Sequence, residues 1–393
     1  GSSRDYNVAI GQDAMRNSNP HVSIAIGYNA GNYLKDGATG AVHIGHEAGN
    51  YASASGNVFM GYQAGMGGTT SAPYSSGQYN IAVGYKALTG FTTGDNNIAI
   101  GYQAADSLTT ADMVVAIGDN ALQSLTGGGY GVAIGRQALQ AETGDYEFVA
   151  IGNLSGQNQN KTTRAYNTYV GHGAGRYNVV GTSNTYLGYY AGYNRKGSSN
   201  VALGNGAMQY LTFGSNNVAV GNAAMAYTSG SYNAAVGAYA GRFATGSNNT
   251  FMGYEAGRGG TTSAPYSSGQ NNVAMGYQAF DAFTQGNLNV AVGYRALSAE
   301  TIGISTVAIG DNAGVAQNFG SHGSTYNTMV GSGAGFWNVT GTGNTYIGSQ
   351  AGVGVSGNSN SHNTGVGANA LAGITTGQYN TTLGKDAGKA ITS

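Results

Sequence analysis

Few residues of this 393-residue chain have types and spacings that could do chemistry. His43 and His46 lie close together with Glu47 beside them, a spacing that could hold a metal ion. The 16 acidic residues are otherwise scattered, whereas a glycosidase needs two carboxylates that flank one cleft. The Gly-Lys-Ser/Thr sequence of phosphate-binding loops is absent from the chain. His43 and His46 stand on either side of the corner residue Gly45, and nothing else in the sequence supports shared ligation. We therefore expect no enzyme, no metal site and no cofactor.

A second candidate site is a segment that the chain contains twice. The sequence GGTTSAPYSSGQ stands at 67–78 and again at 259–270. In each copy a tyrosine follows a proline, Tyr74 after Pro73 and Tyr266 after Pro265. Exposed aromatic rings of this kind stack on sugars, which makes these four residues candidates for ligand binding. Two alternatives remain: the loops could be solvated and bind no ligand, or they could contact neighbouring chains and hold them together.

Composition excludes several classes of protein. Charged residues are 8% of the chain, against roughly a quarter in ordinary globular domains. The 15 Lys and Arg residues are scattered and form no basic patch, so we expect no nucleic-acid partner. The hydrophobic fraction of 41% argues against disorder, and no apolar run is long enough to cross a membrane. With no Cys, the chain has no disulfide framework.

The elements that must position these residues follow from an internal repeat. The pattern Asn, apolar, Ala, apolar, Gly, two variable residues, Ala occurs as NVAIGQDA at 7–14 and NIAVGYKA at 80–87. It recurs about 22 times, mostly every 16 or 17 residues, a period that is too short for helical repeats and fits two short strands and two corners. We therefore predict an all-β parallel solenoid, with 1–393 as one domain and corner-loop insertions at 65–79 and 257–271.

Each repeated position has a predicted structural role. The Asn side chains should stack as a ladder that hydrogen-bonds the corner backbone. The Gly allows positive φ or a close approach to the next turn. The Tyr that often follows it should stack between turns, as in Tyr62, Tyr85 and Tyr102. We favour this structural role for the tyrosines over a carbohydrate track along the surface.

The middle residue of the apolar triplet carries the prediction of self-association. By the two-residue period of strands, we expect the two flanking residues to fill the coil and the middle one to point outward. A solvated outer face should be polar, yet these residues are Ala or aromatic, so another copy of the chain should cover them. The alternative is a coil wall that is merely small and weakly apolar. The predicted interface residues are Ala82, Ala99, Ala116, Ala133, Ala150, Tyr169, Tyr186, Ala202, Ala219, Ala291 and Tyr346.

The repeats NVAIGQDA, NIAIGYQA and NVAVGYRA resemble the YadA-like head repeats of trimeric autotransporter adhesins. They are also similar to the NTAVGYQAL arrays of bacteriophage tail fibres and related surface fibres. The resemblance covers all of the turns. It implies a left-handed parallel β-roll, three chains packed around one axis, and a role in attachment.

These observations together lead to an expected function. We expect a structural fibre or adhesin shaft, extracellular on a virion or a bacterial surface, that forms a homotrimer and attaches to cell-surface glycans. The alternative is a purely structural subunit of an extracellular filament that polymerises end to end. An ice-binding solenoid ranks last, because its regular Thr-x-Thr ranks are present in only a minority of turns.

Overall fold

The computed structural model describes residues 6–144, 146–161, 163–194, 196–210, 213–261, 263, 265–357 and 359–393. Over these residues the chain is a parallel β-solenoid of about 22 turns with one short strand in each turn. No helix that could cross a membrane occurs in this described part. The chain forms two compact units, Gly1–Gly197 and Ser198–Ser393, and each is described by itself. The prediction of a single domain over 1–393 stays a prediction.

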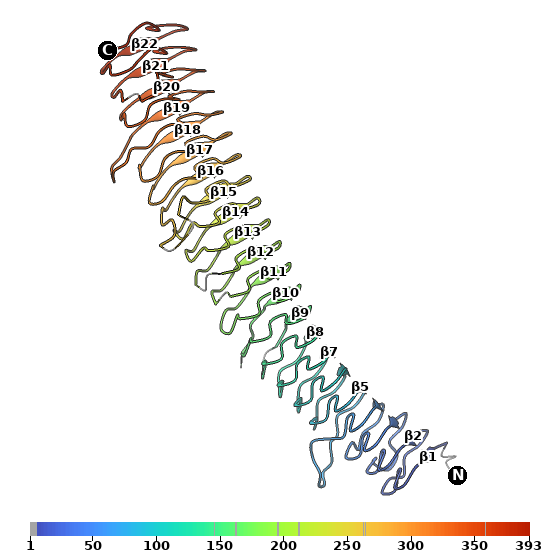
Figure 1. The fold of residues 1–393 in the computed structure, drawn as a ribbon. Helices are drawn as coiled ribbons and strands as arrows, with labels where there is room; N and C mark the ends of the chain where they lie inside the picture. Colours follow the sequence, from blue (N-terminus) through green and yellow to red (C-terminus); the bar gives the residue numbers. More distant parts are fainter. Residues whose placement is uncertain are drawn as a thin grey trace. The chain divides into compact units, whose positions relative to one another are not determined.

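The first unit is a stack of parallel strands, and neighbouring strands within the unit pair in register (Figure 1). Equivalent residues of the repeat face each other, as Ala82 does with Ala99. The strands are β1 (Val8–Ile10), β2 (Ile24–Ile26), β3 (Val42–Ile44), β4 (Val58–Met60), β5 (Ile81–Val83), β6 (Ile98–Ile100), β7 (Val115–Ile117), β8 (Val132–Ile134), β9 (Val149–Ile151), β10 (Thr168–Val170) and β11 (Thr185–Leu187).

The second unit repeats this arrangement, with Ala274 opposite Ala291 in the same register. Its strands are β12 (Val201–Leu203), β13 (Val218–Val220), β14 (Ala234–Val236), β15 (Thr250–Met252), β16 (Val273–Met275), β17 (Val290–Val292), β18 (Val307–Ile309), β19 (Thr328–Val330), β20 (Thr345–Ile347), β21 (Thr364–Val366) and β22 (Thr381–Leu383). The predicted parallel solenoid is therefore confirmed.

Each turn contains one regular strand rather than the two that the period suggested. On the other sides of the turn, the described residues form isolated bridges in place of a second strand, such as Ala52 with Ser75 and Ala244 with Ser267. Residues at positive φ, such as Lys86 and Leu88 after β5, bend the backbone out of the extended conformation. The backbone still bonds from turn to turn there, since Leu88 N donates to Ala104 O at 2.9 Å.

The Gly that ends each strand is required by both conformation and space. Gly84 has φ +130°, and a Cβ there would lie 2.5 Å from the carbonyl oxygen of Gly101 in the next turn. Only glycine fits such a position without moving the backbone. This close approach allows the turns to stack directly, as the repeat predicted.

The predicted Asn ladder is present and buried. Asn80 N donates to Asn57 Oδ1 at 2.9 Å, and Asn97 N donates to Asn80 Oδ1 at 2.9 Å. The side-chain nitrogen Nδ2 of Asn80 donates to Gly94 O at 2.9 Å. Each Asn therefore satisfies backbone groups that the solenoid buries, which avoids the free-energy cost of leaving them unpaired.

The predicted orientation of the strand residues is wrong, because the middle residue points into the coil. Within the single chain, the flanking residues are partly exposed, as Ile81 is at 36% and Ile100 at 37%. The coil is narrow, so the small residue of the triplet fits inside and the β-branched ones lie outside. The predicted interface residues are all buried to 1% exposure or less, namely Ala82, Ala99, Ala116, Ala133, Ala150, Tyr169, Tyr186, Ala202, Ala219, Ala291 and Tyr346. They offer no side-chain surface to a second chain.

The core of each unit follows a simple rule of volume. Where the middle residue is large, the position six residues later is glycine in the same turn and in the preceding turn, as Gly257 and Gly241 are for Phe251. Where the middle residue is Ala, as Ala82 is, a leucine such as Leu88 can occupy that position. Leu88 has φ 55° and Gly257 has φ 55°, so the backbone accepts a side chain at this position. Glycine is therefore needed there to make room for the ring.

The same rule holds for every large middle residue. The pairs of large residue and following glycine are His43 and Gly49, Phe59 and Gly65, Tyr169 and Gly175, Tyr186 and Gly192, Phe251 and Gly257, Met329 and Gly335, and Tyr346 and Gly352. The glycines of the preceding turns are Gly31, Gly49, Gly156, Gly175, Gly241, Gly314 and Gly335.

Candidate functional site

The two copies of the repeated segment form loops between β4 and β5 and between β15 and β16. Both ends of the first loop are paired with neighbouring turns: Gly68 N donates to Phe91 O at 2.8 Å and Ser75 N donates to Tyr51 O at 3.0 Å. The second loop makes the equivalent bonds, from Gly260 N to Phe283 O at 2.7 Å and from Ser267 N to Phe243 O at 3.0 Å. The paired ends present each Pro-Tyr pair on the surface in a defined position.

Tyr74 packs into an aromatic cluster with tyrosines of two preceding turns. Its ring centroid lies 4.4 Å from that of Tyr33 and 6.1 Å from that of Tyr51, and Tyr33 and Tyr51 are themselves 5.5 Å apart. Pro73 beside it is exposed. Burial and, second, the neighbouring Tyr33 raise the pKa of Tyr74, so its phenol is a neutral hydrogen-bond donor at physiological pH. Tyr74 is thus a supported ring rather than a freely moving one.

A cavity of about 420 Å³ opens beside this cluster. Tyr33, Pro73 and Tyr74 supply its apolar wall. The polar wall consists of Asn17, Lys35, Asp36, Ser53 and Ser76. Aromatic rings beside convergent hydrogen-bonding groups are suited to a sugar ring, which has apolar faces and a polar rim.

The second copy of the loop has different surroundings. The centroid of Tyr266 lies 5.1 Å from that of Tyr227 and 5.9 Å from that of Phe243. The Arg242 guanidinium carbon lies 5.0 Å from the Phe243 ring centroid. At the positions of Lys35 and Asp36 the second unit has Ser229 and Gly230. Identical loops therefore lie beside unlike walls, and the charged Lys-Asp pair of the first polar wall is not reproduced. Pro265 is exposed, as Pro73 is.

The predicted tyrosine ladders are confirmed. Tyr62, Tyr85 and Tyr102 stack with centroids 5.2 Å apart and rings within 9° of parallel. In the second unit, Tyr277 stacks on Tyr254 at 5.4 Å and on Tyr294 at 5.3 Å. The rings cover one another's faces and leave their edges to solvent. This arrangement supports the structural role, because a carbohydrate track would need free ring faces.

The two histidines that could share a metal ion do not come together. His43 is the middle residue of β3 and is fully buried against Phe59, with ring centroids 5.0 Å apart. His46 lies on the outside, where it stacks between Tyr28 and Tyr62. Its Nδ1 lies 3.7 Å from Glu47 Oε2. Among the described residues, no group of three or more His, Cys, Asp and Glu side chains is placed to hold a metal ion.

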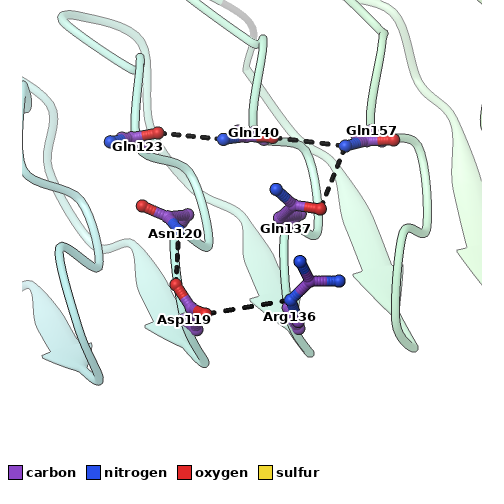
Figure 2. A network of polar contacts seen from close by, with 7 residues as sticks. All are labelled: Asp119, Asn120, Gln123, Arg136, Gln137, Gln140 and Gln157. Atoms are coloured by element: carbon purple, nitrogen blue, oxygen red, sulfur yellow. Dashed lines mark hydrogen bonds and ion pairs between the residues drawn. The ribbon is translucent and has the colours of Figure 1, made fainter.

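Sequence reasoning missed a ladder of glutamine side chains on neighbouring turns (Figure 2). Gln140 Nε2 donates to Gln123 Oε1 at 2.9 Å, and Gln157 Nε2 donates to Gln140 Oε1 at 3.2 Å. Nearby, Arg136 Nε lies 3.8 Å from Asp119 Oδ2. The amides bond to one another along the row, so they hold the turns together and would compete with a ligand for the same groups.

The cavity residues Tyr33, Lys35 and Asp36 were also missed. They lie in a turn well before the loop, and only the stacking register brings them to Tyr74. A signal was present, since Tyr33 and Tyr51 each occur six residues after the strand-ending Gly of their turn, Gly27 and Gly45. Residues at one offset in successive turns form one column on the surface of a solenoid.

No family model and no curated protein sequence matches this chain. The resemblance to YadA-like head repeats therefore depends on the repeated motif itself. What is established is the parallel β-solenoid and its repeat of about 17 residues.

Proposed function

We propose that this chain is a structural shaft of an extracellular fibre or adhesin, on a virion or a bacterial surface, which attaches to glycans. One observation carries the proposal: the cavity of about 420 Å³ in which Tyr33 and Tyr74 face Lys35 and Asp36. Its mixture of aromatic and hydrogen-bonding groups matches the chemistry of a sugar. A single such site binds weakly, and several chains in one fibre would supply the avidity for attachment.

We further propose that copies of the chain associate as a homotrimer through the outer face of the strands. Parallel sheets occur almost only with both faces covered. Here one face lines the coil and the other exposes rows of Val, Ile, Leu and Met, including Met60 at 41% and Leu187 at 45% exposure. Contiguous apolar patches of this kind are rare on monomers. The flanking residues, and not the middle residues first predicted, form this proposed interface.

A glycan-binding measurement tests the proposed attachment. The wild-type chain and the variant Tyr74→Ala are applied to an array of bacterial and host glycans. We expect the variant to bind about tenfold more weakly, because it loses the aromatic contact with the sugar. Tyr266→Ala is the matched control, since the same loop sequence surrounds it without the Lys-Asp pair, and it should retain binding. Undiminished binding by Tyr74→Ala, or no glycan binding by the wild type, would contradict the proposal.

A further inference from the structure

A second cavity, of about 310 Å³, lies in the second unit beside the only Trp of the chain. Trp337 is 38% exposed and packs edge-on against Phe336, with ring centroids 4.7 Å apart. The cavity is lined by Arg295, Asn312, Val315, Ala316, Phe336 and Trp337. It therefore combines an apolar floor with one cationic and one amide side chain.

The equivalent position of the first unit has different side chains. The stretch 166–188 is repeated in sequence at 326–348, which places Arg176 and Tyr177 where the second unit has Phe336 and Trp337. Arg176 lies over the Tyr177 ring at 5.1 Å, and its Nε donates to Gln157 Oε1 at 2.8 Å. This network occupies the surface between the turns.

The second unit has lost that network. Val315 stands at the position of Gln157, and Val353 stands at that of Tyr193, whose hydroxyl accepts a hydrogen bond from Arg176 at 3.2 Å. The three residues at these positions, Val315, Phe336 and Val353, are all apolar and cannot form the hydrogen bonds that Arg176 forms. The side chains at this position thus differ between the two blocks, although the solenoid backbone is repeated.

The charge at the cavity comes from Arg295. In the described part of the chain no ion pair involves this guanidinium, and the residue is exposed. Burial raises the pKa of Asp281, and the effect of Arg295 on that pKa is the smallest of those acting on it. The ion pair of Asp281 is with Arg258, at 3.8 Å. Asp311 Oδ1 accepts a hydrogen bond from Asn312 Nδ2 at 3.1 Å.

We infer that this cavity binds a pyranose sugar that carries a carboxylate, of the uronic acid class. The Trp337 ring would pack against the apolar face of the sugar, and Arg295 would pair with its carboxylate. Asn312, the amide side chain of the cavity lining, would hydrogen-bond the sugar hydroxyl groups. The site lies in the other unit from Tyr74 and does not depend on the function proposed for that loop.

The single Trp makes the test specific, because tryptophan fluorescence of the full chain reports only on Trp337. The chain is titrated with D-glucuronate and, separately, with D-glucose, which has the same ring without the carboxylate. We expect a saturable change in fluorescence with glucuronate. The affinity for glucose should be at least about tenfold lower than that for glucuronate, because glucose cannot form the charged hydrogen bonds.

The variant Arg295→Gln tests the residue that selects the acid. Gln278 occupies the equivalent position one turn earlier with φ 50°, so the solenoid accepts this substitution. We expect the variant to bind glucuronate about tenfold more weakly, approaching the affinity for glucose. Arg136→Gln, which changes an exposed arginine of the first unit, should leave the titration unchanged. Equal affinity for the two sugars, an unaffected Arg295→Gln variant, or the absence of any saturable signal would overturn the inference. None of these outcomes would bear on glycan binding at Tyr74.

Discussion

At the scale of single residues, His43 is a polar side chain that the core holds without a hydrogen bond. Both ring nitrogens are buried and have no partner in the structure. Gly31 and Gly49 make room for the ring, which stacks on Phe59. Burial lowers the pKa of His43 from 6.5 to about 3, because protonation would place an unpaired charge in the core.

This histidine should make the first unit less stable in acid. The folded pKa lies below the unfolded one, so the stability is fully present above about pH 6.5 and is lost as the pH falls from there towards 3. At about pH 5 the loss is about 2 kcal/mol. Hydrogen exchange at β3, corrected for intrinsic rates, measures this change in the free energy of opening.

The variant His43→Phe should remove the acid-dependent loss of stability. A Phe ring fits at this position, because Phe59 and Phe251 occupy the equivalent position beside equivalent glycines in other turns. His46→Phe serves as the control, since His46 is exposed, and it should keep the wild-type pH dependence. If His43→Phe and the wild type lose stability equally between about pH 7 and pH 5, the buried histidine is not the cause.

At the scale of the repeating turn, the pairing of large middle residues with glycines predicts a compensating pair of substitutions. Phe251→Ala should cost about 3–5 kcal/mol because it leaves a cavity. Gly257→Leu should cost about 3 kcal/mol or more because the leucine overlaps the Phe251 ring. The double variant recreates the Ala82 and Leu88 pair of another turn. Its loss of stability should be at least about 2 kcal/mol smaller than the sum of the losses in the two single variants.

Hydrogen exchange at β15 and its neighbours β14 and β16 gives the three free energies of local opening that this comparison needs. Strictly additive losses would show that Phe251 and Gly257 do not share one volume. The strands themselves are only three residues long, so this shared core, together with the Asn ladder, determines the stability of each turn.

The repeat could be predicted from the sequence because its spacing and its required glycines are periodic. The Asn and Tyr ladders followed, since in-register stacking brings equivalent residues together. The direction of each side chain could not be predicted. The two-residue period of a strand assigns alternate residues to its two faces, but it does not show which face lies inside the coil. The pairing of Phe251 with Gly241 and Gly257 was the missing signal, since a residue that needs space made in two turns must lie within the coil. The cavity at Tyr74 also depends on contacts between turns.

At the scale of the whole molecule, the exposed apolar face of the strands is the feature that demands a partner. Ile100 and Ile151 are each 37% exposed on that face. Replacing both with Lys should prevent the proposed trimer, because association would bury two unpaired charges. The strands should persist, since these side chains point away from the coil and the Asn ladder is untouched.

Light scattering on a sizing column measures the native mass that decides this prediction. We expect three chains for the wild type and one chain for the Ile100→Lys, Ile151→Lys double variant. Met113→Lys is the control: Met113 is 53% exposed but lies at a corner, outside the strands, so this variant should remain trimeric. A wild-type mass of one chain would leave the apolar face without its proposed partner. Long polymers whose length rises with concentration would instead favour a filament that grows end to end, because a closed trimer has a fixed mass.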